Sequence, residues 1–243
     1  MKKLTILIIF VSLYTVTMAQ EDRNFRIPLL GETAPSFTAE TTNGTLNFPG
    51  DFGKKWKVLL SHPQDFTPVC SSEILELAQM QSEFDKLGAK VVVVSTDNIK
   101  SHKDWVNALE ELKYKDREPV KIKFPLVDDY SKTVAKKYGM IHPNTNSTKD
   151  VRGAFIIDPN NVIQAVYFYP MNVGRSTSEL LRALTALQTS SGNNHFATPA
   201  DWKNGDDVLV TVPPKGAEDN TKPAPDGFYR VSWFMLFKEG SAQ

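Results

Sequence analysis

The sequence contains very little cysteine and histidine. Cys70 is the only cysteine among 243 residues, so no disulfide can form within the chain. A zinc site built from several cysteines is excluded by the same count. The four histidines are scattered along the sequence, which disfavours a histidine-based site. We therefore expect neither a metal ion nor a cofactor.

The sequence also lacks an excess of either charge. Lys and Arg together number 28, as do Asp and Glu, so the formal net charge is zero. A nucleic-acid-binding protein is disfavoured, because no basic excess is available to neutralise phosphates. The hydrophobic fraction is 41% and the charged fraction 23%, which is typical of a globular protein with a sizeable core and not of a disordered chain.

Long hydrophobic runs are absent except at the start of the chain. Residues 1–19 contain two lysines, an apolar stretch from Leu4 to Val16, and then small residues up to Ala19. This order is typical of a secretory signal peptide, with cleavage after Ala19. The apolar stretch is shorter than the roughly 20 residues that a membrane-spanning helix needs. We expect a soluble protein exported to the periplasm, without stable membrane insertion.

Predicted strands and helices alternate along the rest of the chain. Apolar runs and alternating patterns indicate strands, and apolar residues at helical spacing indicate helices. The predicted strands are 56–61, 91–95, 124–129, 153–158 and 162–168, with an earlier hairpin around Asn43-Gly44; the predicted helices are 70–88, 105–112, 131–138 and 176–187. This order predicts an α/β domain with a mixed central sheet and helices on both faces.

The part of the chain after the signal peptide divides into three segments. Residues 20–188 form the predicted α/β domain, and the polar composition of 189–195 predicts a linker. The C-terminal extension, 196–243, contains possible strands at 208–212 and 229–237. It is too small for an independent core, so we expect it to pack on the main domain or on a second subunit.

The turn from His62 to Cys70 lies between a predicted strand and a predicted helix. Thr67 is a suitable N-cap residue, and Pro68 suits the first helical position, where an N–H would have no intrahelical partner. Cys70 then lies in the first helical turn, where free N–H groups and the helix dipole favour thiolate over thiol. Thr67 lies one turn earlier, so its hydroxyl can face the sulfur. These groups predict a pocket for a small polar electrophile.

Cys70 also has a simpler interpretation as an inert core residue, because free cysteine is among the most buried residue types. The turn around it favours a reactive cysteine instead. Pro63 and Pro68 flank Thr67 and hold the turn in one shape, which an inert cysteine would not require. Pro63 has no N–H and can line the pocket without competing for the sulfur.

The residues around Cys70 resemble a known family. Pro63, Thr67 and Cys70 form the pattern P-x-x-x-T-x-x-C of the peroxiredoxins (AhpC/TSA-like), and the string SHPQDFTPVCSSE resembles the one-cysteine peroxiredoxin 6 subfamily. Other segments are similar and occur in the same order: PSFTAETTNG, VVVVSTD, FPLVDD, RGAFIIDP and TPADWKNGDDV. The resemblance covers nearly all of the chain after the signal peptide, including the C-terminal extension.

The resemblance implies a thioredoxin-like fold and an antioxidant peroxidase. Cys70 would attack hydrogen peroxide or a small organic hydroperoxide, release water or alcohol, and become a sulfenic acid. Because the chain has no second cysteine, an external thiol would have to regenerate Cys70. The resemblance also implies a homodimer, with the C-terminal extension crossing to the partner.

The resemblance assigns roles to further residues. The Thr67 hydroxyl and the backbone N–H of Cys70 would hold the peroxide, and Pro63 would shield the sulfur from bulk water. Arg152 matches the family arginine that lies over the thiolate. Arg175 matches a second arginine that supports the pocket, although a solvated residue before a helix is the alternative.

Two of the other polar residues each have two interpretations, and the remaining histidines have only a structural one. His62 either hydrogen-bonds near the sulfur or is a satisfied polar group at a strand end. Glu73 either orients an arginine or complements the helix N-terminus. His102, His142 and His195 have no partners at ligand spacing, and we expect them on the surface or in the linker.

Two functional classes stay open at the level of the sequence. The leading hypothesis is a thiol peroxidase, and the alternative is a non-catalytic holdase or interaction protein on the same fold. Rapid oxidation of Cys70 by one equivalent of peroxide would distinguish the first from the second. A disulfide oxidoreductase is disfavoured, because such enzymes normally use a C-x-x-C pair.

Overall fold

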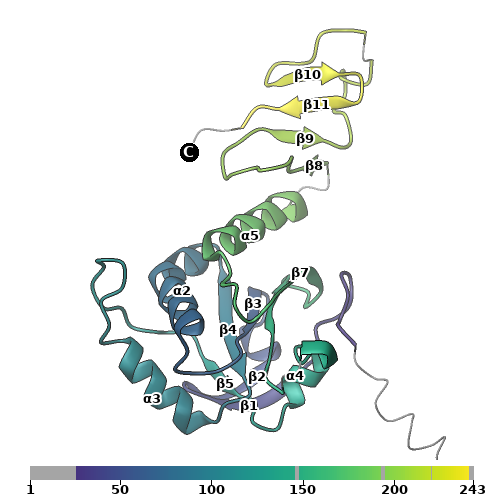
Figure 1. Cartoon of the computed structure of the whole chain (residues 1–243). Coiled ribbons are helices and arrows are strands. Elements are labelled where there is room, and N and C mark those ends of the chain that lie inside the picture. The colour runs from purple at the N-terminus through teal and green to yellow at the C-terminus, as the bar shows by residue number, and fades with distance from the viewer. Residues whose placement is uncertain (1–25, 146–147, 193–194, 220, 241–243) are drawn as a thin grey trace, which may run out of the picture.

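The computed structural model describes four ranges of the chain, residues 26–145, 148–192, 195–219 and 221–240. The predicted signal peptide, 1–19, lies outside the described residues. Figure 1 shows an α/β domain, from which the last long helix leads to a small separate sheet near the C-terminus. Within the described ranges, no helix has the length and apolar character needed to cross a membrane.

A mixed sheet of seven strands forms the centre of the α/β domain. Its strands are β1 (Phe37–Thr41), β2 (Gly44–Phe48), β3 (Trp56–Ser61), β4 (Ala89–Ser95), β5 (Leu126–Asp128), β6 (Arg152–Ile157) and β7 (Ile163–Tyr169). They lie in the order β2-β1-β5-β4-β3-β6-β7. The central strands β3, β4 and β5 are parallel, and the other neighbours are antiparallel.

Helices cover both faces of this sheet, as the sequence predicts. They are α2 (Pro68–Lys86), α3 (Ile99–Leu109), α4 (Thr133–Lys137) and α5 (Thr177–Gly192), with 3₁₀ turns η1 (Gly50–Phe52) and η2 (Pro143–Thr145). Val58 and Leu60 of β3 pack with α2, α3 and α5, whereas Leu59 packs on the opposite face with α4. Strands buried on both faces need continuous apolar runs, which β3 and β4 provide.

The boundaries of α2 follow from local sequence signals. Thr67 is the N-cap residue with an extended backbone (φ −110°, ψ 146°), and Pro68 occupies the first helical position. Gly88 follows the C-terminal end with a φ of 63°, which glycine adopts without strain. The Thr67 side chain does not cap the helix, because its Oγ1 donates to the Gln64 carbonyl oxygen at 2.8 Å.

The C-terminal extension forms a four-stranded antiparallel sheet. Its strands are β8 (Phe196–Ala197), β9 (Val208–Val210), β10 (Phe228–Ser232) and β11 (Met235–Lys238), in the order β10-β11-β9-β8. The prediction of one strand over 229–237 is wrong, because Trp233 and Phe234 form a turn between two strands.

The predicted linker over 189–195 is also wrong over its first half. α5 continues to Gly192, and residues 193–194 lie outside the described part of the chain. The hydroxyl groups of residues 189–191 each donate to a backbone carbonyl three or four residues earlier. The hydroxyl groups of this polar segment therefore have hydrogen-bond partners within the helix itself.

The C-terminal extension contacts the main domain through α5 (Figure 1). Trp202 is 3% exposed and packs with Ala186 of α5 and Val208 of β9. The Trp202 carbonyl also accepts a hydrogen bond from Arg182 Nη1 at 3.2 Å. The extension therefore shares its apolar packing with the last helix of the α/β domain.

Asp150 is an unusual buried carboxyl group just before β6. It is 0% exposed, and within the described part of the chain neither of its carboxylate oxygens has a hydrogen-bond partner. Burial raises the pKa of Asp150 well above its ordinary value, and the charges of Asp129 and Asp97 raise it further. The folded state therefore binds a proton at Asp150 more tightly than the unfolded state does.

This pKa shift predicts how Asp150 affects stability. The folded state loses stability as the pH rises from the ordinary carboxyl pKa through the raised one. Asp150→Asn removes the charge and keeps the shape, so we expect a higher Tm at pH 7, by about 2–4 °C for each kcal/mol gained. Thermal unfolding across pH should show this gain shrinking toward about pH 4. An equal gain at all pH values would contradict the assignment.

Candidate active site

Cys70 lies in the first turn of α2, next to the end of β3. It is 0% exposed, and its Sγ accepts a hydrogen bond from Arg152 Nη1 at 3.3 Å. The first backbone bond of the helix joins the Ser71 N–H to the Thr67 carbonyl at 2.9 Å. The N–H of Cys70 therefore precedes the helical ladder and is available to a bound molecule. The sulfur lies beside a fixed positive charge at the positive end of a helix dipole.

Glu73 holds two arginines at this site. Its Oε2 accepts from Arg152 Nη1 and from Arg175 Nη2, both at 2.8 Å, and its Oε1 accepts from Arg175 Nε at 2.9 Å and from the Arg175 backbone N–H at 2.7 Å. The three side chains are at most 5% exposed. Glu73 therefore orients arginines, and the side chain of Arg175 is buried rather than solvated. Cys70 and Glu73 are three residues apart, which places them on one face of α2.

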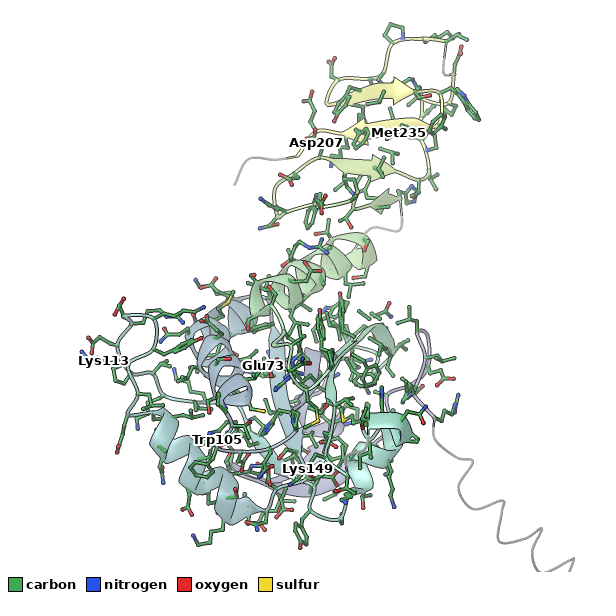
Figure 2. All side chains as sticks on the ribbon, viewed as in Figure 1. Glu73, Trp105, Lys113, Lys149, Asp207 and Met235 are labelled. Carbon is green, nitrogen blue, oxygen red and sulfur yellow. The ribbon has the colours of Figure 1, made fainter. Side chains whose placement is uncertain are left out.

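The Arg152 guanidinium is fixed by three acceptors. Besides Cys70 and Glu73, the Met171 carbonyl accepts from Nε at 3.1 Å and from Nη2 at 2.6 Å. These bonds join β6, α2 and the segment after β7, and Figure 2 shows Glu73 among them in the interior of the domain. Because the guanidinium is planar, these partners keep Nη1 directed at the sulfur.

Arg152→Lys tests this arrangement. A lysine keeps the charge but cannot donate to the sulfur, Glu73 and the Met171 carbonyl at the same time. We expect the rate of Cys70 oxidation by hydrogen peroxide, measured by stopped flow, to fall by about 10²–10³-fold. Arg26→Lys, at an exposed arginine outside the site, should leave the rate unchanged. A wild-type rate in the Arg152 variant would show that simultaneous donation by the planar guanidinium to these three acceptors is not needed for oxidation of Cys70.

Thr67 and Pro63 line the turn before Cys70. Thr67 is half-buried, and its hydroxyl group donates a hydrogen bond to the Gln64 carbonyl oxygen. A hydroxyl oxygen has two acceptor lone pairs, so Thr67 Oγ1 can still accept a hydrogen bond from an arriving O–H group. Pro63 is buried in the same turn.

The segment after β7 helps to cover the sulfur. Gly174 lies against Val69 and Glu73, and the Met171 carbonyl is bound to Arg152. Since Cys70 is 0% exposed, a molecule as large as a peroxide reaches Sγ only when a covering group moves. A larger reactant would require a larger movement of these covering groups.

His62 is buried next to the site. It is 1% exposed, its ring lies 5.0 Å from that of Trp105, and among the described residues neither ring nitrogen has a hydrogen-bond partner. The sequence offers two interpretations of His62, a hydrogen bond near the sulfur and a satisfied polar group at a strand end, and both are therefore wrong. Burial lowers the pKa of His62 well below its ordinary value, and neighbouring positive charges lower it further, so the imidazole is neutral at pH 7.

The prediction that His102 lies on the surface is wrong. His102 is 0% exposed, with Nδ1 2.9 Å from Asp65 Oδ2 and Nε2 3.0 Å from the Val127 carbonyl oxygen. Its spacing to Trp105 and Leu109, the other buried residues of α3, is the signal that could have shown this. Sequence reasoning also missed Asp65, whose partner His102 is 37 residues away. The remaining histidines differ from His102, since position 142 is half-buried and position 195 is exposed.

Comparisons with known proteins decide the family. The model of the AhpC/TSA family matches residues 30–166. A peroxiredoxin of Methanosarcina mazei is 40% identical over 216 residues, covering 88% of this chain and 98% of its own. The chain belongs to the AhpC/TSA family. A 1-Cys peroxiredoxin of Dictyostelium discoideum is 36% identical over 206 residues, covering 85% of this chain and 83% of its own.

Solved structures of peroxiredoxins share the fold. The yeast mitochondrial 1-Cys peroxiredoxin has a TM-score of 0.76 and 34% identity, covering 88% of this chain and 100% of its own. A cysteine-to-serine mutant of peroxiredoxin 6 from Arenicola marina has a TM-score of 0.75 and 32% identity, covering 88% and 99%. The predicted thioredoxin-like fold is confirmed. With one cysteine in the chain, this peroxiredoxin is a thiol peroxidase of the one-cysteine type.

Proposed function

We propose that this peroxiredoxin reduces hydrogen peroxide and small organic hydroperoxides to water or alcohol, and that an external thiol regenerates it. The observation that carries the proposal is the 3.3 Å contact between Arg152 Nη1 and Cys70 Sγ at the N-terminal end of α2. The buried position of Cys70 supports small substrates over bulky ones.

The oxidation step uses four groups of the site. The Cys70 thiolate attacks one peroxide oxygen in line with the O–O bond, and the electron pair of that bond leaves with the second oxygen. Arg152 Nη1 and the Cys70 N–H donate to the oxygens as negative charge moves onto them. Thr67 Oγ1 accepts the peroxide O–H and fixes its orientation. The leaving oxygen takes a proton from solvent, and the sulfur becomes a sulfenic acid.

The reduction step needs two thiols from outside the chain. The sulfenic acid condenses with the first thiol, releasing water and forming a mixed disulfide, and the second thiol then displaces the reductant from Cys70. The yeast mitochondrial 1-Cys peroxiredoxin is resolved via glutathione/thioredoxin systems. We propose reductants of these two classes for this chain.

Peroxide consumption with different thiols tests the proposed cycle. Without thiol, we expect the protein to consume one equivalent of hydrogen peroxide per chain in a fast phase, since it has one cysteine that forms a sulfenic acid. Dithiothreitol, glutathione and thioredoxin are then compared as donors, and at least one physiological thiol should restore turnover. Failure to consume the first equivalent would overturn the peroxidase proposal. Turnover with dithiothreitol alone would overturn only the reductant classes.

We also propose a homodimer, with the C-terminal extension crossing to the partner. Large apolar side chains are exposed on the β10–β11 hairpin, where Val231 is 64%, Trp233 75% and Phe234 67% exposed. A patch of this kind supports a protein–protein contact, because burying it removes apolar surface from water.

Light scattering on the full chain tests the dimer. The double variant Trp233→Ser/Phe234→Ser should shift the mass from dimer to monomer. Leu112→Ser is the matched control, because Leu112 is 48% exposed and lies outside the extension. A monomeric wild-type protein, or a double variant that stays dimeric, would refute the proposed interface.

We further propose export to the periplasm with cleavage after Ala19. The support is the order of two lysines, an apolar stretch and small residues in 1–19. Fractionation of a bacterial host followed by N-terminal sequencing should find a periplasmic chain that begins at Gln20. An uncleaved chain in the cytoplasm would refute this proposal.

A further inference from the structure

Three buried side chains meet beneath the active-site turn. His62, Asp65 and His102 are 1%, 3% and 0% exposed, and one ligand atom from each lies within 4.8 Å of the other two. His62 follows β3, Asp65 lies in the turn before α2, and His102 belongs to α3. Only the fold brings them together, which is why their separation in the sequence disfavoured a metal site.

The hydrogen-bond partners of His102 leave its Nδ1 facing another acceptor. Nε2 lies 3.0 Å from the Val127 carbonyl oxygen, which can only accept, so Nε2 carries a proton. Nδ1 then holds a lone pair in the neutral ring, and it lies 2.9 Å and 3.1 Å from the Asp65 carboxylate oxygens. Two acceptors this close need a cation between them, either a proton or a metal ion.

His62 supplies an unused donor atom to the same place. Its Nε2 lies 3.5 Å from Asp65 Oδ1, and among the described residues neither ring nitrogen accepts or donates a hydrogen bond. A buried imidazole without partners is costly, and native structures normally satisfy such groups.

The surroundings orient the three side chains as ligands. The Val127 carbonyl fixes the tautomer of His102, and Ser101 Oγ donates to Asp65 Oδ2 at 2.7 Å. Carbonyl and hydroxyl groups that hydrogen-bond the ligand side chains in this way are typical of metal sites. Tetrahedral zinc at ordinary bond lengths separates its ligand atoms by about 3.3 Å. The closest nitrogen–oxygen distances here, 2.9 Å and 3.5 Å, lie on either side of that value.

We propose that His62, Asp65 and His102 form a binding site for a divalent transition-metal ion, with Zn²⁺ as the best fit. Two imidazoles and one carboxylate are ligands that zinc uses, with the fourth position left to water. The site is separate from the peroxidase chemistry, because it requires neither Cys70 nor peroxide. A bound ion would tie the turn that carries Pro63 to α3 and so restrict the entrance to the active site.

Zinc binding to the full chain tests the site directly. Protein treated with a chelator is titrated with Zn²⁺ against a chromophoric indicator, and native mass spectrometry counts the ions bound. We expect one ion per chain in the wild type and in Cys70→Ser. Asp65→Asn and His102→Asn should each lose more than about tenfold in affinity, whereas the control His195→Asn should bind like the wild type.

Two further measurements keep the proposal testable if a variant does not fold. Excess Zn²⁺ should raise the Tm of the wild type, and the same concentration of Mg²⁺ should not, because Mg²⁺ prefers oxygen ligands. Co²⁺ should quench the fluorescence of Trp105, whose ring lies 5.0 Å from that of His62. No zinc retained by the wild type, equal binding by folded His102→Asn, or loss of binding in Cys70→Ser would each overturn the proposal.

Discussion

Cys70→Ser is expected to reduce peroxide turnover to the rate of buffer and thiol alone. A serine hydroxyl is not ionised at neutral pH and cannot donate the electron pair that breaks the O–O bond. The chain has no other cysteine that could take over the reaction. Consumption of hydrogen peroxide in the presence of dithiothreitol measures the effect.

Ser72→Ala is the matched control for this variant. Ser72 lies in the same turn of α2, and its hydroxyl donates to the Val69 carbonyl at 2.7 Å without contacting the sulfur. Its removal should leave turnover near the wild-type rate. A Cys70→Ser protein with substantial activity would remove the peroxidase mechanism, whatever the control shows.

Glu73→Ala is expected to cause the largest loss of stability at the site. It leaves the buried guanidinium groups of Arg152 and Arg175 without their carboxylate. Removing one partner of a buried ion pair typically costs about 3–5 kcal/mol, because an uncompensated charge remains buried. Oxidation of Cys70 should also slow, since Arg152 loses a group that aims it at the sulfur.

Urea unfolding compares this variant with Glu83→Ala. Glu83 lies on the same helix, but its ion pair with Lys86 is exposed, with side-chain exposures of 45% and 71%. Exposed pairs contribute about 0–1 kcal/mol, so the control should be nearly as stable as the wild type. If both variants lose equally little free energy of unfolding, Glu73 does not hold the arginine pair together.

Elements defined by local signals could be predicted from the sequence. The strand at 56–61 matches β3 residue for residue, because an apolar run buried on both faces leaves little ambiguity. The sequence predicts the start of α2 from Thr67 and Pro68, and the helix begins at Pro68 with Thr67 in the N-cap position, although the Thr67 hydroxyl bonds the Gln64 carbonyl instead of capping the helix. Cys70 in the first helical turn follows directly from that boundary.

Features that depend on distant contacts could not be predicted in the same way. His102 is buried by Asp65 and Val127, which are 37 and 25 residues away. Glu73 meets Arg152 and Arg175 across separations of 79 and 102 residues. The sequence shows that such residues are polar but does not show which residues they contact. Only the resemblance to a family predicted Arg152 and Arg175 as residues of the active site.

Composition alone was also misleading at two places. The polar composition of 189–195 predicts a linker, yet the hydroxyl groups of residues 189–191 donate to helical carbonyls and α5 continues to Gly192. The apolar pattern over 229–237 continues through Trp233 and Phe234, which hid the turn between β10 and β11. Those two side chains are exposed, so no burial pattern marked the boundary.

The reaction of Cys70 with a single equivalent of hydrogen peroxide tests the central claim most directly. Stopped-flow mixing with reduced protein, followed by thiol titration and mass spectrometry, measures both the rate and the product. We predict complete loss of the free thiol within seconds and a mass increase of one oxygen atom at Cys70. A thiol that reacts only as slowly as free cysteine would contradict the account and favour a non-catalytic holdase on the same fold.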